Sequence, residues 1–203
     1  MLFYYSIAVL TTSLGAASAL TRHAVCSESP KLICYGENDN TVAEAGGSQG
    51  LDPEHVQYVA AYLRWLSEAN EGAAKFWTMA RADDCTEWTL PVPNGGTVLA
   101  LAKHTSPWLT SSVLYEDMAT AIDGGKDAGA GGDKTLLRCG KQGGQVGVAA
   151  NLKNLMYNTE EYKKSGAKPE GVLLKLVKAP PSKRWAKSRG ALSDGSYQVC
   201  EMI

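Results

Sequence analysis

The sequence predicts an α+β fold: a small sandwich in which helices pack on a mainly antiparallel sheet, stapled by disulfide bonds. Three observations predict this class. Residues 51–181 alternate between segments with helical apolar spacing and short strand-like segments, and glycine and proline residues separate them. The resulting order of helix, strand, helix, strands, small helix and strand favours helices that cover one face of a sheet. Five cysteines in 203 residues favour a disulfide framework.

The first element is a helix that begins at Asp52 and ends near Gly72. Asp52 is a good N-cap, and Pro53 suits the first helical position, where its missing N–H costs nothing. Tyr62 and Trp65 fall beside the apolar stripe, and we expect them to widen the surface that faces the core. The stripe itself recurs at helical spacing and consists of Val56, Val59, Ala60, Leu63 and Leu66.

A strand and a second helix follow. The prolines in residues 88–93 make that segment extended, and Asn94–Gly96 is a turn. Residues 97–104 are then expected to form a strand, because the segment is short and turn residues flank it. Ser111 or Ser112 is expected to cap the second helix, which the glycines after residue 123 stop.

The last part of the chain is expected to contain three short strands and one small helix. The strands are residues 135–139, 145–150 and 172–177, and the glycine-rich residues 140–144 are expected to form a hairpin turn between the first two. The helix covers residues 159–165 and ends at Gly166. In the last strand, one face carries Val172, Leu174 and Leu176, and the other carries Leu173, Lys175 and Val177.

Residues 1–19 are predicted to be a signal peptide. An apolar run from Ile7 to Leu14 precedes Ala17–Ala19, whose small residues are typical of a cleavage site. The run is too short to span a membrane, so no transmembrane segment is expected. The protein is therefore predicted to be secreted and extracellular.

The mature chain divides into three parts. Residues 20–50 form an N-terminal segment with a short disulfide loop, residues 51–181 form the α+β domain, and residues 182–203 form a basic tail that we expect to be flexible. The tail composition is also compatible with anionic surfaces, nuclear import or processing at its dibasic pair. Because the net charge is only −1, nucleic acid is not an expected partner.

All five cysteines lie beyond the predicted cleavage site, where oxidation favours their pairing. The preferred pairs are Cys26 with Cys34, which closes a short loop, and Cys85 with Cys139, which closes a loop of about 54 residues. Sequence alone does not fix the connectivity, and Cys200 is left over. Metal ligation is disfavoured because the chain has no C-x2-C pair and no histidine close to a cysteine, so neither a metal nor a cofactor is expected.

Candidate catalytic residues are few. His104 ends a predicted strand, and Glu116 and Asp117 lie in the first turn of the second helix. A histidine paired with one carboxylate is the minimum for acid–base cleavage of RNA or a glycoside. The two carboxylates are equally explained by the helix dipole, and the chain lacks serine-hydrolase, Walker and zinc-protease motifs.

Several short segments between residues 76 and 148 resemble small secreted effector-type proteins of filamentous fungi, and more loosely the putative necrosis-inducing factor family. The resemblance implies a compact sandwich related to killer-toxin-like folds and an action outside the fungal cell on a host or competitor. It supplies no catalytic residues. The segments that carry it are Asp84-Cys85, Glu87–Leu90, Thr97–Ala102, Ser112–Ala119 and Leu137–Gly140.

The sequence therefore favours a non-enzymatic secreted protein that binds a protein or surface component of a host or competitor and so modulates virulence or immunity. A secreted hydrolase, such as an RNase using His104 with Glu116 or Asp117, is one alternative. An antimicrobial protein that resembles killer toxins and acts at membranes is the other. A cleft that joins His104 to a carboxylate would favour the hydrolase.

Overall fold

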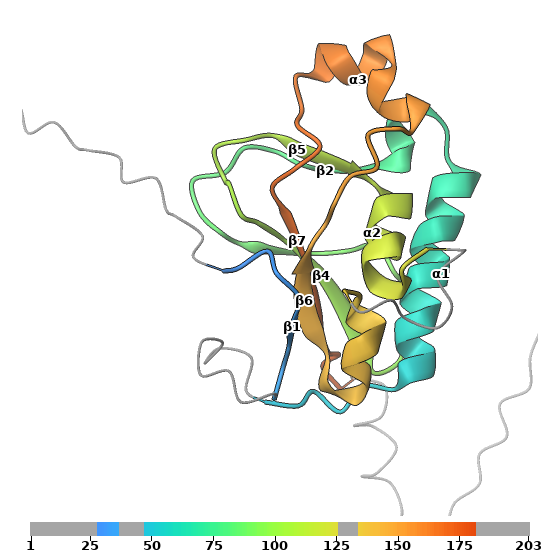
Figure 1. Cartoon of the computed structure of the whole chain (residues 1–203), viewed down its shortest axis with the longest axis vertical. Coiled ribbons are helices and arrows are strands. Elements are labelled where there is room, and N and C mark those ends of the chain that lie inside the picture. The colour runs from blue at the N-terminus through green and yellow to red at the C-terminus, as the bar shows by residue number, and fades with distance from the viewer. Residues whose placement is uncertain (1–27, 37–46, 126–133, 182–203) are drawn as a thin grey trace, which may run out of the picture.

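The computed structural model describes residues 28–36, 47–125 and 134–181 (Figure 1). Its main element is a five-stranded antiparallel sheet in the order β1-β6-β7-β4-β3, beside a two-stranded sheet of β2 and β5. The strands are β1 (Ile33–Cys34), β2 (Phe76–Met79), β3 (Glu87–Thr89), β4 (Val98–His104), β5 (Ser111–Leu114), β6 (Gly144–Gly147) and β7 (Val172–Lys178). The predicted signal peptide and the basic tail lie outside the described residues.

The helices complete the α+β fold, which confirms the predicted class. Helices α1 and α2 lie side by side on one face of the five-stranded sheet, and α3 lies at the far end of the molecule beyond the β2–β5 pair (Figure 1). The α-helices are α1 (Pro53–Ala69), α2 (Tyr115–Asp123) and α3 (Glu160–Ser165), and the 3₁₀ turns are η1 (Gly72–Lys75), η2 (Leu136–Gln142) and η3 (Leu155–Asn158).

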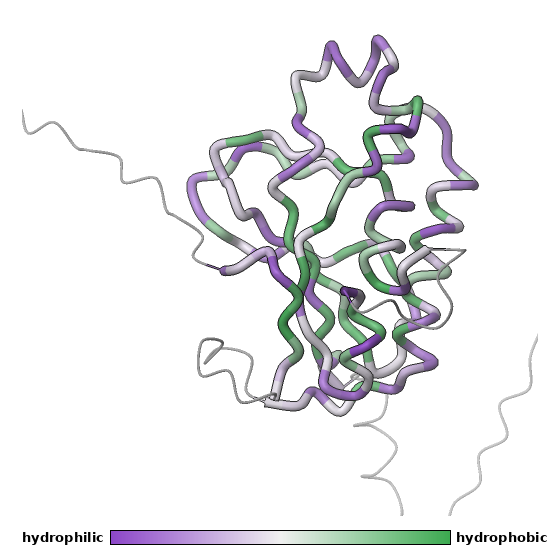
Figure 2. Tube along the Cα trace, in the orientation of Figure 1, coloured by the Kyte–Doolittle hydropathy of each residue, from purple (hydrophilic) through white to green (hydrophobic). Residues whose placement is uncertain are grey.

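The main core lies between the two long helices and the sheet. Figure 2 shows hydrophobic residues gathered along the central strands. Every second residue of β4 and β7 faces the helices, as the alternation in residues 172–177 predicts. These inward side chains include Ala100, Ala102, Val172, Leu174 and Leu176, and they pack with Val59, Leu63, Met118 and Ile122 of the helices.

Helix α1 begins as predicted, because the Asp52 carboxylate accepts a hydrogen bond of 2.9 Å from the Glu54 backbone N–H. The expectation that Trp65 widens the core-facing surface is wrong: 53% of this residue is exposed. Each residue advances a helix by about 100°, so Trp65 points about 160° away from the buried Leu63. The tryptophan therefore lies on the outer surface of the helix layer.

The second helix starts later than predicted. Ser111 and Ser112 do not cap it, because residues Ser111–Leu114 form strand β5 and pair with β2 in the register Phe76↔Leu114. The helix begins at Tyr115 and ends as expected at Gly124, whose φ of 89° suits glycine. Local residue preferences could not reveal the strand, since its partner is supplied by a segment about 35 residues earlier.

The segment before β6 also differs from the prediction. Residues 135–139 are not a strand: Leu136–Gln142 form the 3₁₀ turn η2, with a kink at Gly140. Residues 140–144 consequently make no hairpin, and Gly144 already belongs to β6, which pairs with β1 and β7. The remaining expected elements, at residues 145–150, 159–165 and 172–177, are confirmed as β6, α3 and β7 with slightly shifted ends.

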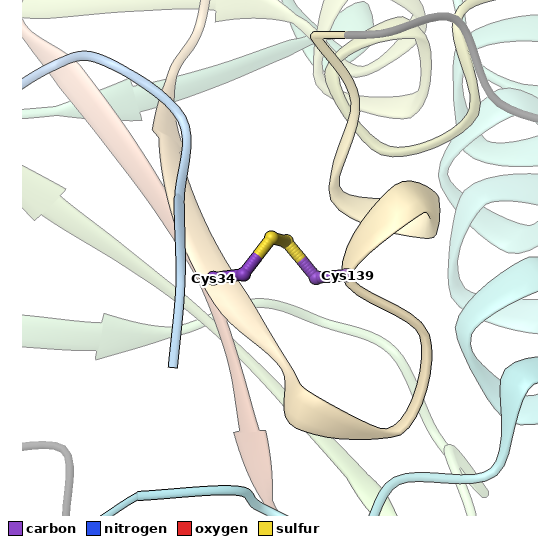
Figure 3. Close-up of a disulfide and its surroundings, with 2 residues drawn as sticks. All are labelled: Cys34 and Cys139. Carbon is purple, nitrogen blue, oxygen red and sulfur yellow. A yellow bond between two sulfur atoms is a disulfide. The ribbon is translucent and has the colours of Figure 1, made fainter. Parts of the chain in front are cut away.

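A disulfide joins Cys34 of β1 to Cys139 of η2, with 5.2 Å between the Cα atoms (Figure 3). Both predicted pairings, Cys26 with Cys34 and Cys85 with Cys139, are therefore wrong, and the short N-terminal disulfide loop does not exist. The cause is the pairing of β1 with β6, which brings Cys34 beside the turn that precedes β6. Cys85 is also disulfide-bonded, with a partner outside the described residues.

Candidate functional sites

The histidine that the sequence singles out is buried. His104 ends β4 on the helix-facing side of the sheet, and only 1% of it is exposed. Its Nε2 lies 2.8 Å from the carbonyl oxygen of Ala80, so this nitrogen carries the proton and donates it to the carbonyl. The ring also packs edge-on against Trp88. These contacts hold the imidazole inside the protein rather than at a surface where a substrate could reach it.

Glu116 is committed to an ion-pair cluster between the two long helices. The Arg64 guanidinium donates hydrogen bonds to Glu116, at 3.2 Å, and to both carboxylate oxygens of Asp123, at 3.0 Å each. The hydrogen bonds to Asp123 contribute most to raising the pKa of Arg64 further, although its partial burial acts in the opposite direction. The cluster links α1 to α2 and has a structural role.

Asp117 points to a different neighbour, the phenol of Tyr157. The Tyr157 hydroxyl donates to the Asp117 carboxylate at 2.5 Å and accepts a hydrogen bond from the Leu114 backbone N–H at 2.9 Å. Burial raises the pKa of Asp117 above its ordinary value, although the hydrogen bonds from Tyr157 and from the Asn151 backbone act against this rise. Burial, followed by the contact with Asp117, also raises the pKa of Tyr157.

The structure therefore does not assemble the predicted acid–base pair. Among the described residues, no hydrogen bond or ion pair joins His104 to Glu116 or to Asp117. Each of the three side chains is held by a partner in a different part of the molecule. The sequence missed Tyr157, because it lies 40 residues from Asp117 and no local motif connects the two.

Asp117 does line a groove between α2 and strand β6. The groove has a volume of about 630 Å³, within the range of small-molecule sites. One wall is α2 from Asp117 to Gly124, and the other is β6 with the segment that precedes β1. Its polar lining includes Lys31, Lys134, Thr120 and Thr135, and its apolar lining includes Leu32, Ala121, Val146 and Ala149.

A second candidate site is a row of three aromatic side chains along α1, which we call the α1 aromatic row: Tyr58, Tyr62 and Trp65. The ring centroids are 6.0 Å apart for Tyr58 and Tyr62, and 5.2 Å apart for Tyr62 and Trp65. Tyr58 is 37% exposed and donates a hydrogen bond of 3.0 Å to the Pro93 carbonyl. The row thus presents a continuous, partly anchored aromatic surface to solvent.

The outer face of the sheet carries a network of opposite charges. Lys103 donates to Glu28 at 2.8 Å, and Lys175 contacts both Glu28 and Glu87. Burial alone would raise the pKa of Glu28, but the two lysines outweigh it and hold this pKa below its usual value. Two cations face two anions, so the network balances its charge and fixes the segment around Glu28 on the sheet.

Two features are absent from the residues that the structure describes. Within residues 28–36, 47–125 and 134–181, no cluster of three or more histidine, cysteine or acidic side chains has the arrangement of a metal site. None of the helices in those ranges has both the length and the apolar character needed to cross a membrane.

Comparison of the chain with models of protein families, with curated proteins and with solved structures finds no match in any of the three. The resemblance to the necrosis-inducing factor family consequently rests on the sequence segments alone. Function must be inferred from the geometry of this chain.

Proposed function

We propose that the chain is a secreted protein that acts outside the cell by binding a protein of a host or competitor, and that it does so through the α1 aromatic row. The observation that carries this proposal is the exposure of Trp65 and Tyr58 on one helix face. Tryptophan and tyrosine are enriched at the centres of protein interfaces, where burial of one ring contributes much of the binding free energy.

The surroundings of the row indicate the charge of the partner. Ala61 and Ala69 are small and exposed, so they leave the rings accessible. Glu54 and Glu68 lie on the same side of the helix and are exposed, whereas Arg64 is turned toward α2. Aromatic rings beside carboxylates favour arginine and lysine side chains, which stack on the rings and pair with the acids. The proposed partner therefore presents a basic surface.

The hydrolase alternative has less support. It requires a base and an acid that meet at a substrate, whereas His104 is buried and the two candidate carboxylates are bound elsewhere. A binding role needs no such arrangement. An effector role that modulates virulence or immunity agrees with the predicted signal peptide and with the resemblance to secreted fungal proteins, and it stays part of this proposal.

The test uses the mature chain, residues 20–203, immobilised and exposed to host or competitor extracellular fluid. A captured protein is identified and purified, and its affinity is measured by calorimetry for the wild type and for Trp65→Ala. We expect the dissociation constant to rise at least tenfold in the variant, as for a central interface tryptophan. Added salt should also weaken the complex, because screening reduces the attraction between the carboxylates and a basic partner.

Leu155→Ala is the matched control, because Leu155 is even more exposed, at 79%, but lies in η3 and outside the α1 aromatic row. The dissociation constant of the Leu155→Ala variant for the captured protein should stay within about twofold of the wild-type value. Equal effects of the two substitutions would contradict the assignment of the row. If the purified chain instead cleaves RNA or polysaccharide, and Asp117→Asn stops the cleavage while the protein stays folded, the hydrolase replaces the binding protein.

A further inference from the structure

We propose that the groove between α2 and β6 binds an amphipathic organic anion: a molecule with an apolar body and one carboxylate. The site is separate from the α1 aromatic row and does not depend on the function proposed for that row. The apolar body would lie in the groove, and the carboxylate would pair with Lys31 and Lys134, two exposed residues of the groove lining.

The apolar character of the groove follows from its place in the fold. Val146 of β6 and Leu32 belong to the edge of the main core or pack against it, and Ala121 of α2 faces them from the helix layer. The groove is thus the side of the core where helix α2 and strand β6 separate. Removal of a hydrocarbon chain from water in such a groove contributes about 0.8 kcal/mol per methylene, or about fourfold in the dissociation constant.

The charges of the groove select the head group. Lys31 and Lys134 are exposed, and neither makes an ion pair with another described residue. The nearby carboxylates do not compensate them, since Glu116 and Asp123 are occupied by Arg64. Asp117 is the single acidic residue among the described lining residues, and its carboxylate is turned to Tyr157. The two lysines therefore make the groove complementary to an anion.

The volume of the groove limits the size of the ligand. A volume of about 630 Å³ is sufficient for a medium-length alkyl chain or a small fused ring system with its head group. Thr120 and Thr135 also line the groove, but the Thr120 hydroxyl is bound to the Glu116 carbonyl in its own helix. The lysines are consequently the groups that distinguish an acid from its neutral analogue.

The test compares decanoate with decanol, which have the same chain and differ in the charged head group. Binding to the mature full chain is measured by displacement of the anionic fluorophore 8-anilinonaphthalene-1-sulfonate and directly by calorimetry. We expect saturable binding of one decanoate per chain, at least tenfold tighter than binding of decanol. Hexanoate should bind more weakly than decanoate, because it buries fewer methylenes.

Three variants locate the site. Ala149→Trp places a large ring in the groove at an exposed position and should abolish decanoate binding. Lys31→Gln combined with Lys134→Gln should raise the dissociation constant for decanoate about tenfold and leave decanol unchanged. Lys153→Gln removes an exposed lysine outside the groove and should have no effect.

Any one of three results would overturn the proposal. These are unaltered decanoate binding in the Ala149→Trp variant, equal affinity for decanoate and decanol, and an absence of saturable binding. Thermal unfolding of each variant verifies that it is folded. The Trp65→Ala variant should bind decanoate normally, so failure of this proposal and failure of the proposed function can be told apart.

Discussion

The two faces of the five-stranded sheet are both buried, but they are built in different ways. On the inner face, Leu174 and Leu176 pack against helices α1 and α2 in an apolar core. On the outer face, Leu173 is equally buried, yet its neighbours include Lys175 and Gln145. The Gln145 amide accepts a hydrogen bond from the Tyr35 hydroxyl at 3.2 Å, and acidic residues pair with the lysine.

The difference shows how one strand can serve two environments. Alternate residues of a strand point to opposite faces, so β7 offers leucines to the helices and a leucine and a lysine to the other side. A buried lysine is tolerated only where partners satisfy its charge. We therefore expect the inner face to respond to loss of volume and the outer face to loss of charge balance.

The largest expected effect comes from the disulfide that joins β1, at the edge of the sheet, to η2. Replacement of both Cys34 and Cys139 with alanine should lower the free energy of unfolding by about 4 kcal/mol, because the bond closes a loop across a separation of 105 residues. Urea denaturation of the oxidised wild type and the variant measures the change. A loss below about 1 kcal/mol would show that strand pairing alone holds β1 in place.

Two adjacent leucines test the comparison directly. Leu173→Ala and Leu174→Ala remove the same atoms from fully buried side chains on opposite faces. Leu174→Ala should cost about 3 kcal/mol, since the helices cannot collapse into the cavity, and Leu173→Ala should cost about 1 kcal/mol less. Urea denaturation again measures both losses. Equal losses would mean that the outer face is packed as tightly as the inner face.

The charge network on the outer face should have a somewhat smaller effect. Lys175→Met leaves Glu28 and Glu87 without their shared cation and should cost about 2 kcal/mol. Lys175→Met combined with Glu87→Gln should recover part of this loss, because one uncompensated carboxylate is removed. A double-mutant cycle by urea denaturation measures the coupling between the two residues, and a coupling near zero would contradict an energetic role for the pair.

The same network predicts that the stability of the folded protein depends on pH. The pKa of Glu28 lies below its usual value in the folded protein, so its contribution to stability is present above about pH 4.5 and is lost as the pH falls through the lowered pKa. Stability measured between pH 6 and pH 3 should therefore decrease more steeply in the wild type than in Glu28→Gln. If stability falls equally with pH in the two proteins, the network is not the origin of the pH dependence.

The sequence predicted the elements whose signals are local. Helix α1 has its Asp52 cap and a complete apolar stripe, and β7 has clear alternation, so both were placed correctly. Strand β5 and turn η2 were misplaced, because their structure depends on partners distant in the chain, β2 for the strand and Cys34 for the turn. The predicted fold class is correct despite these two errors, because it depends on the number and type of the elements more than on where each one begins and ends.

The candidate sites were less predictable than the fold. The apolar stripe beside Trp65 predicts that this residue faces the core, but its angle around the helix places it outside. Lys31 and Lys134 belong to no motif and meet at one groove only through the tertiary fold. The residue types of His104, Glu116 and Asp117 suggest acid–base chemistry. Catalysis also requires these side chains to lie close together in space, and their spacing along the chain does not determine that distance.

The smallest expected effect concerns the basic tail and the remaining cysteines. The last strand ends at Lys178, and the large apolar residues of positions 182–203 are scattered, so truncation after Pro181 should change the melting temperature by less than about 2 °C. The disulfide of Cys85 makes this a sharp test, because a bond to Cys200 would be lost with the tail.

We predict that Cys26, rather than Cys200, is the partner of Cys85. Cys26 and Cys85 each lie two residues before a glutamate, Glu28 and Glu87, and both glutamates contact the same Lys175 ammonium group. Because Lys175 holds Glu28 and Glu87 together, a bond between the residues two positions before each of them spans a short distance along the chain. Thiol labelling of the denatured, unreduced chain should find one free thiol in the intact protein and none after truncation. Two free thiols in the truncated form, with a large drop in melting temperature, would instead assign the bond to Cys200 and make the tail part of the folded structure.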